Sequence, residues 1–117
     1  MSIYDPLSRR ISVVKGESIN NGFQLYSAKD GSVFTDADLS EVRLVSSALG
    51  IDVACQYDSQ SEMWYPEIGG DVTGDWDVGN YTYDLKVVYA SAGESVVYSA
   101  IHAAELDVLE NVNEVSL

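Results

Sequence analysis

The stretch Asp75–Tyr89, "DWDVGNYTYDLKVVY", decides the fold class of this chain. From Tyr81 onward, an aromatic or aliphatic side chain occupies every second position. These side chains belong to Tyr81, Tyr83, Leu85, Val87 and Tyr89. Successive side chains of a strand point to opposite faces, whereas a helix would scatter the same residues around its axis. The stretch therefore predicts a half-buried β-strand.

Shorter stretches on both sides of this strand repeat the alternation. The predicted strands contain the pairs Ile11 and Val13, Phe23 and Leu25, and Val42 and Leu44. The turn "SAGE" at 91–94 predicts a hairpin into a strand at 95–103, and a last strand is expected at 104–109. A helix over 101–115 is the alternative, because "IHAAELDVLENVNEV" contains good helix formers. Frequent turn signals leave room for seven or eight strands and favour an all-β sandwich.

Length and composition predict one folded domain without nucleic-acid affinity. A chain of 117 residues has room for one core, and 46% hydrophobic residues are enough to form it. Nineteen acidic and six basic residues give a formal net charge of −13, which repels nucleic-acid phosphates. From the predicted strands we expect the sandwich at 10–109, with an N-terminal arm at 1–9 and a C-terminal tail at 110–117.

The termini and the cysteine content indicate the compartment. Cys55 is the only cysteine, so no internal disulfide is possible, and its place in "IDVACQY" predicts a small core residue. The first residues lack the charged and apolar segments of a secretory signal, and no run is long and apolar enough for a membrane span. We expect synthesis in a cytoplasm and no membrane contact.

Gly79, Tyr81 and Tyr83 have the spacing of the tyrosine corner of immunoglobulin-like sandwiches. In that motif the tyrosine hydroxyl donates a hydrogen bond to backbone just upstream. The resemblance implies that Tyr81 locks the corner and that Gly79 adopts a conformation that a Cβ atom disfavours. Tyr83 would occupy the position of a disulfide cysteine, so that packing alone closes the core.

Further segments resemble, in order, the immunoglobulin-like domains of tailed-bacteriophage virion proteins, such as the N-terminal domains of baseplate and upper tail-fibre proteins. They are "ISVVKGESI", "FQLYSAKDGSVFTDADLSEVRLV", "GDWDVGNYTYDLKVVY" and "AELDVLENV", and together they span about residues 10 to 112. The middle, 47–72, matches no part of that pattern. In addition, many relatives are the first module of a much longer fibre protein, whereas this sequence stops after the domain, so we expect a stand-alone virion component in place of a fibre's anchor.

The resemblance implies a non-enzymatic structural protein of a phage virion, in the tail, at the head–tail joint or on the capsid. Its partners would be other virion proteins, and it would act as a homo-oligomer or within a symmetric assembly. The alternative is a small acidic protein that inhibits a nucleic-acid-binding or defence protein of the host, because a charge of −13 resembles that of nucleic acid. No cofactor is expected on either interpretation.

The chemistry-bearing residues are few. His102 is the only histidine and lies in an apolar run without a nucleophile motif, so no catalytic residue is assigned. The acidic loop 67–77 contains Glu67, Asp71, Asp75 and Asp77; its spacing misses the EF-hand pattern, so no metal site is assigned. Aromatic residues flank this loop, and we expect them to contact a partner or to fill the core. They are Trp64, Tyr65 and Trp76.

Overall fold

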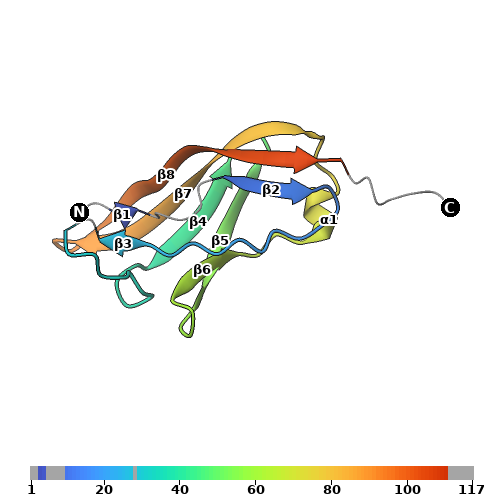
Figure 1. Ribbon diagram of the computed structural model, residues 1–117. Helices are drawn as coiled ribbons and strands as arrows, with labels where there is room; N and C mark the ends of the chain where they lie inside the picture. Colours follow the sequence, from blue (N-terminus) through green and yellow to red (C-terminus); the bar gives the residue numbers. More distant parts are fainter. Residues whose placement is uncertain (1–2, 5–9, 28, 111–117) are drawn as a thin grey trace.

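The computed structural model describes residues 3–4, 10–27 and 29–110, which form eight strands and one short helix (Figure 1). The elements are β1 (Ile3–Tyr4), β2 (Ile11–Val14), β3 (Tyr26–Ser27), β4 (Glu41–Ser46), β5 (Ile51–Asp58), β6 (Met63–Pro66), α1 (Gly70–Thr73), β7 (Gly79–Ser91) and β8 (Glu94–Leu109). In the described part of the chain, no helix is long and apolar enough to cross a membrane. Because eight of the nine elements are strands and the one helix has four residues, the described part of the protein is all-β, as the alternation predicts.

Six strands form one curled mixed sheet in the order β2-β8-β7-β4-β5-β6. Neighbours are antiparallel except for β2 and β8, which run parallel. β1 and β3 form a separate two-stranded antiparallel sheet. The strand predicted from the opening stretch is β7, in the middle of the large sheet.

The segment after β2 crosses the sheet and joins its two edges. β2 pairs with β8 at one edge, and the chain then runs to the opposite edge, where Ile19 bridges to Ile68 and Phe23 bridges to Trp64. Figure 1 shows this segment in front of the sheet, alongside β6. Because one stretch of chain is bound to both edges, the sheet is held in its curl.

The core lies between the sheet and the crossing segment. Phe23 and Leu25 of the crossing segment are fully buried, and Phe23 packs against Tyr83 with ring centroids 6.1 Å apart. The sheet contributes the alternate residues of β4 and β7, which lie on its concave face. Cys55 is also buried, as predicted, and burial raises the pKa of its thiol to about 12. The core is thus closed by packing, without a covalent bond.

The crossing segment corrects one sequence prediction. Phe23 and Leu25 are buried on one face, but they do not belong to a regular strand: Phe23 forms an isolated bridge with Trp64, and no bridge is formed at Leu25. The bridges 19↔68 and 23↔64 share one antiparallel register, in which Asn21 would face Pro66. Pro66 has no N–H to donate, so the ladder is interrupted there.

β8 corrects the expected division of the last strands. The chain from 94 to 109 is one strand, so the predicted strands at 95–103 and 104–109 are continuous, and the helical alternative fails for the described residues up to 110. Register shifts opposite Asp84 and after Leu85 show two bulges in β8, and Ala103 has a φ of 52°. The alternation is lost at these bulges, which is why the sequence suggests a break.

A short helix, α1, was not predicted from the sequence. Thr73 is fully buried, and its Oγ1 donates to the Glu17 carbonyl at 2.7 Å and accepts from the Gly16 N–H at 3.1 Å. Gly70 lies so close to this turn that a Cβ atom would be 2.2 Å from the Gly16 carbonyl oxygen. Together these contacts attach α1 to the turn that follows β2.

Candidate functional site

Tyr81 forms the hydrogen bond that the tyrosine-corner spacing predicts. Its hydroxyl donates to the carbonyl oxygen of Asp77 at 2.7 Å, four residues upstream and just before β7 begins. Tyr83, two residues later, is 1% exposed and packs in the core. The bond fixes the path of the chain as it leaves the acidic loop and enters the central strand.

The expectation for Gly79 is wrong. Its φ lies outside the left-handed region, which among the described glycines is occupied by Gly16, Gly31, Gly50 and Gly93. A Cβ atom on Gly79 would meet the Tyr81 ring and hydroxyl at 3.5–3.6 Å, which is ordinary van der Waals contact. The corner therefore uses the tyrosine, and the glycine is not required by its geometry.

Two of the three proposed contact aromatics belong to the core. Trp64 is 4% exposed, packs against Tyr57 with ring centroids 4.9 Å apart, and donates from Nε1 to the Phe34 carbonyl at 3.4 Å. Trp76 is 7% exposed. Because both side chains are buried in the hydrophobic core, neither is available to a partner.

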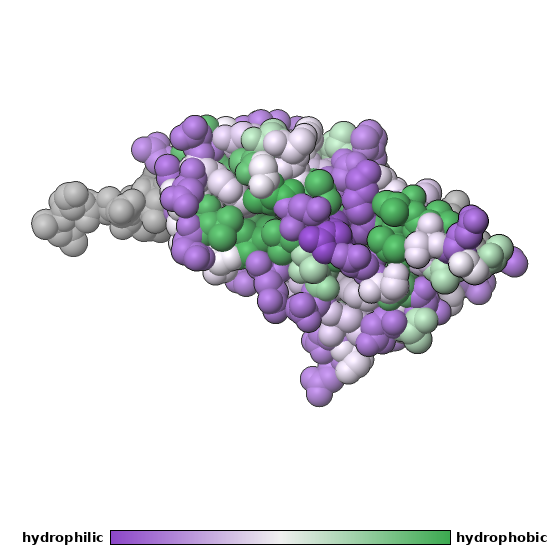
Figure 2. Space-filling view, turned by 180° about the vertical axis from the view of Figure 1, so that it is seen from behind, coloured by the Kyte–Doolittle hydropathy of each residue, from purple (hydrophilic) through white to green (hydrophobic). Residues whose placement is uncertain are grey.

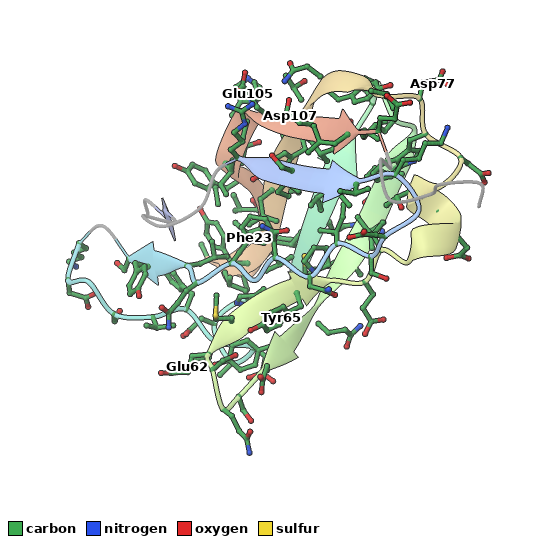
Figure 3. All side chains as sticks on the ribbon, turned by 45° about the vertical axis from the view of Figure 1, so that its right-hand side comes forward. Phe23, Glu62, Tyr65, Asp77, Glu105 and Asp107 are labelled. Carbon is green, nitrogen blue, oxygen red and sulfur yellow. The ribbon has the colours of Figure 1, made fainter. Side chains whose placement is uncertain are left out.

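Tyr65 is the proposed contact residue that remains at the surface. Its ring lies over Gly22, where a Cβ atom would be 2.6 Å from Cε1. It borders an open groove of about 460 Å³ between 18–20 and 65–69. This groove coincides with the interrupted ladder at Pro66, and its rim carries Glu67. Figure 3 shows Tyr65 far from Asp77, so the groove and the tyrosine corner are separate places.

The acidic loop does not gather its carboxylates. Asp71, Asp75 and Asp77 are all exposed, and Glu67 lies at the groove. Across residues 3–4, 10–27 and 29–110, no group of three or more His, Cys, Asp or Glu side chains is placed to hold a metal ion. The four acidic residues of the loop thus face solvent, while its residues 70–73 form α1.

Asp107 forms a polar cluster that the sequence did not reveal. It accepts hydrogen bonds from Asn80 and from the Nε of Arg10, the latter at 2.7 Å, and Arg10 also lies 3.4 Å from Glu105. The Asn80 hydrogen bond and the Arg10 guanidinium hold the pKa of Asp107 below its usual value. The cluster links the ends of β2, β8 and β7. Figure 3 labels Glu105 and Asp107 along β8.

Asp84 forms a second cluster at the bulge of β8. Its carboxylate accepts from the Ala103 N–H at 2.8 Å and lies 2.9 Å from His102 Nδ1 and 3.5 Å from Lys86 Nζ. Partial burial raises the pKa of Asp84. The hydrogen bond from Ala103 and the contact with His102 lower it by more, so the pKa of Asp84 lies below its usual value. Ser99 donates to Asp84. This arrangement gives the bulge its hydrogen bonds and provides no Ser–His–Asp order for catalysis.

Comparison with protein-family models, curated proteins and solved structures found no match. The functional argument therefore depends on the residues and on their geometry.

Proposed function

We propose that this chain is a non-enzymatic structural component of a tailed-phage virion, acting through protein–protein contacts. The observation that carries the proposal is the Tyr81–Asp77 hydrogen bond, because it is the defining contact of the motif through which the sequence resembles the phage domains. The ordered resemblance over about residues 10 to 112 adds support, since its weaker segments occur in the family's order.

We further propose that the fold is a variant of the immunoglobulin plan. The order β8-β7-β4-β5-β6 corresponds to the G-F-C-C′-C″ sheet of variable-type domains, with Tyr81 near the start of the strand equivalent to F. The second sheet of that plan corresponds here to the crossing segment and the small β1–β3 sheet. The departure lies in that second layer, where the pairing of the crossing segment with β6 is interrupted at Pro66.

The mechanism proposed for this role is passive. A curled sheet with both edges held by one crossing segment presents its loops and its long hairpin in fixed positions. Association buries apolar surface at about 25 cal/mol per Å² before ordering costs are subtracted. In a symmetric particle each contact is repeated, so weak individual contacts still give firm attachment.

The test is electron microscopy of particles assembled without this protein, compared with particles complemented in trans. We expect one density to be missing in the deleted particles and restored on complementation. Complete and fully occupied particles in the absence of the protein would reject the virion role.

The rival function is inhibition of a basic host protein, and the net charge of −13 favours it. Affinity purification of the chain from infected cells separates the two functions. Recovery of virion proteins supports the structural role. Recovery of a host nuclease, with no virion protein, supports the inhibitor.

A further inference from the structure

The pair Asn21–Gly22 lies in the crossing segment, where the pairing of that segment with β6 is interrupted. It is the one Asn-Gly pair in the sequence. Such pairs commonly form tight hairpin turns with positive φ, but Gly22 is not among the described glycines with positive φ. Bridges at Ile19 and Phe23 hold the chain on either side, and residues 20–22 between them belong to no strand or bridge.

The glycine of this pair is explained by packing, whereas the asparagine is not. A Cβ atom on Gly22 would lie 2.6 Å from Cε1 of the Tyr65 ring, so no larger residue fits there without movement. Asn21 is half-buried, and its side-chain amide forms no hydrogen bond with the described residues. The amide is therefore not held in place next to the glycine.

The Gly22 N–H is also free of hydrogen bonds within the described part of the chain. Phe23 and Trp64 exchange both of their backbone hydrogen bonds, each at 2.8 Å. Successive N–H groups of an extended chain point to opposite sides, so the N–H of Gly22 points away from β6. Both groups of a reactive pair, a side-chain amide and the next backbone nitrogen, are thus unrestrained.

We propose that Asn21 deamidates through Gly22 and that the isoaspartate product loosens the crossing segment. The Gly22 backbone nitrogen attacks Asn21 Cγ and closes a cyclic imide. The Cγ–Nδ2 bond breaks, and the departing nitrogen takes the Gly22 amide proton and leaves as ammonia. Water, which reaches this place through the open groove at 18–20 and 65–69, then adds to either imide carbonyl and gives aspartate or isoaspartate. Glycine favours ring closure because it has no side chain to hinder the attacking nitrogen.

Two other sites in the described chain are held by hydrogen bonds against the same reaction. Gly31 follows Asp30, but its N–H donates to the Ser27 carbonyl oxygen at 2.8 Å. Asn80 lies in β7, its side-chain amide donates to Asp107, and a tyrosine follows it. The structure therefore singles out Asn21 and provides Asn80 as an internal comparison.

The isoaspartate product lengthens the crossing segment. Its main chain runs through the former side chain and gains a carbon atom. Because the bridges at Ile19 and Phe23 fix both ends of this stretch, the added atom displaces at least one of them. Phe23 is fully buried and packs against Tyr83, so its displacement disturbs the core.

This disturbance affects one face of the sheet. Figure 1 shows the crossing segment in front of the sheet, and Figure 2 shows the opposite side, where hydrophilic residues separate two apolar areas. Deamidation weakens the cover of the core on the front and leaves the back unchanged. The inference goes beyond the virion role, because it holds whether or not the chain is part of a particle.

Peptide mapping by mass spectrometry, during storage of the folded chain at mildly alkaline pH, tests the site. Alkaline pH favours the reaction because the attacking amide must lose its proton. The peptide with Asn21 should gain the mass difference between an amide and a carboxylic acid at least tenfold faster than the peptide with Asn80. Fragmentation should place the change at Asn21 and not at Asn20. An unchanged Asn21, or equal rates at Asn21 and Asn80, would overturn the proposal.

Urea denaturation of the products tests the loosening. Asn21→Gln is the matched control, because its longer side chain closes the imide ring far more slowly. Asn21→Asp introduces the charge without the additional main-chain atom. The isoaspartate fraction, isolated by chromatography, should unfold at lower urea concentration than the fresh chain, stored Asn21→Gln or fresh Asn21→Asp. An unchanged midpoint in the isoaspartate fraction, or an equal loss in either variant, would overturn the loosening.

Discussion

At the scale of single residues, the hydrogen bond of Tyr81 is the contact on which the start of β7 depends. Removing the hydroxyl with Tyr81→Phe keeps the ring and loses the bond to Asp77. We expect the free energy of unfolding to fall by about 0.5–1.5 kcal/mol. Tyr89→Phe is the control on the same strand, and urea denaturation should show almost no change for it. Equal losses for the two variants would mean that the Tyr81 bond contributes nothing specific.

Two glycines should respond in opposite ways to alanine. At Gly79 the added methyl group makes ordinary contacts and restricts the unfolded chain, so Gly79→Ala should leave stability unchanged or raise it by about 0.4–1 kcal/mol. At Gly70 the same methyl group collides with the Gly16 carbonyl oxygen, and Gly70→Ala should cost about 1–3 kcal/mol. Thermal unfolding of both variants measures the difference. A large loss of stability in Gly79→Ala would contradict this and would mean that Gly79 does adopt a backbone conformation that a Cβ atom disfavours.

At the scale of elements, the sequence was most informative where alternation is uninterrupted. β2, β4, β7 and the hairpin turn follow directly from alternating residues and from "SAGE", whose Ala92 and Gly93 both have positive φ. The burial of Phe23 and Leu25 was also predictable. What could not be predicted is which edges these residues join, because a period of two gives the buried face of a strand and not its neighbour.

The elements that sequence analysis missed depend on long-range contacts. α1 is stabilised by Thr73 and Gly70 against a turn more than fifty residues earlier, and nothing within "IGGDVTG" indicates that partner. The sequence also did not show whether Trp64 is buried, because a tryptophan in a strand can either fill the core or contact a partner at the surface. The Asp107 and Asp84 clusters were missed because their partners meet only after β7 and β8 pair.

These two clusters predict how stability depends on pH. The folded pKa values of Asp84 and Asp107 both lie below their usual values, so their contributions are complete above the unfolded pKa of about 3.9. The contributions are lost as pH falls through the lower, folded values. Unfolding midpoints in urea should therefore decrease as the pH falls below about 4.

The variants Asp84→Asn and Asp107→Asn should each flatten this decrease, because the titrating group has been removed. Asp71→Asn, which removes an exposed carboxylate of the acidic loop, controls for the change in net charge. A decrease that stays equally steep in both cluster variants would show that other carboxylates govern acid unfolding.

At the scale of the whole molecule, a net charge of −13 on 117 residues should destabilise the compact state by self-repulsion. Surface ion pairs such as those of Arg43 with Glu41 and Asp52 oppose this effect weakly, at about 0–1 kcal/mol each. Repulsion among many carboxylates exceeds these few pairs. Raising NaCl from low to moderate concentration should therefore raise the unfolding temperature, and a fall would show that the ion pairs dominate.

The proposed virion role also concerns the whole molecule, because a structural component acts through many copies of the entire folded chain in one particle. A structural component is incorporated in a set number, whereas an inhibitor of a host protein stays outside the particle. The amount of this chain relative to the other particle proteins therefore separates the two functions.

Quantitative mass spectrometry of gradient-purified particles tests the proposed role most directly. We predict a constant whole-number copy number per particle that matches the symmetry of the tail, the neck or the capsid. Absence of the chain from purified particles, or an amount that varies from one preparation to the next, would contradict the proposed role.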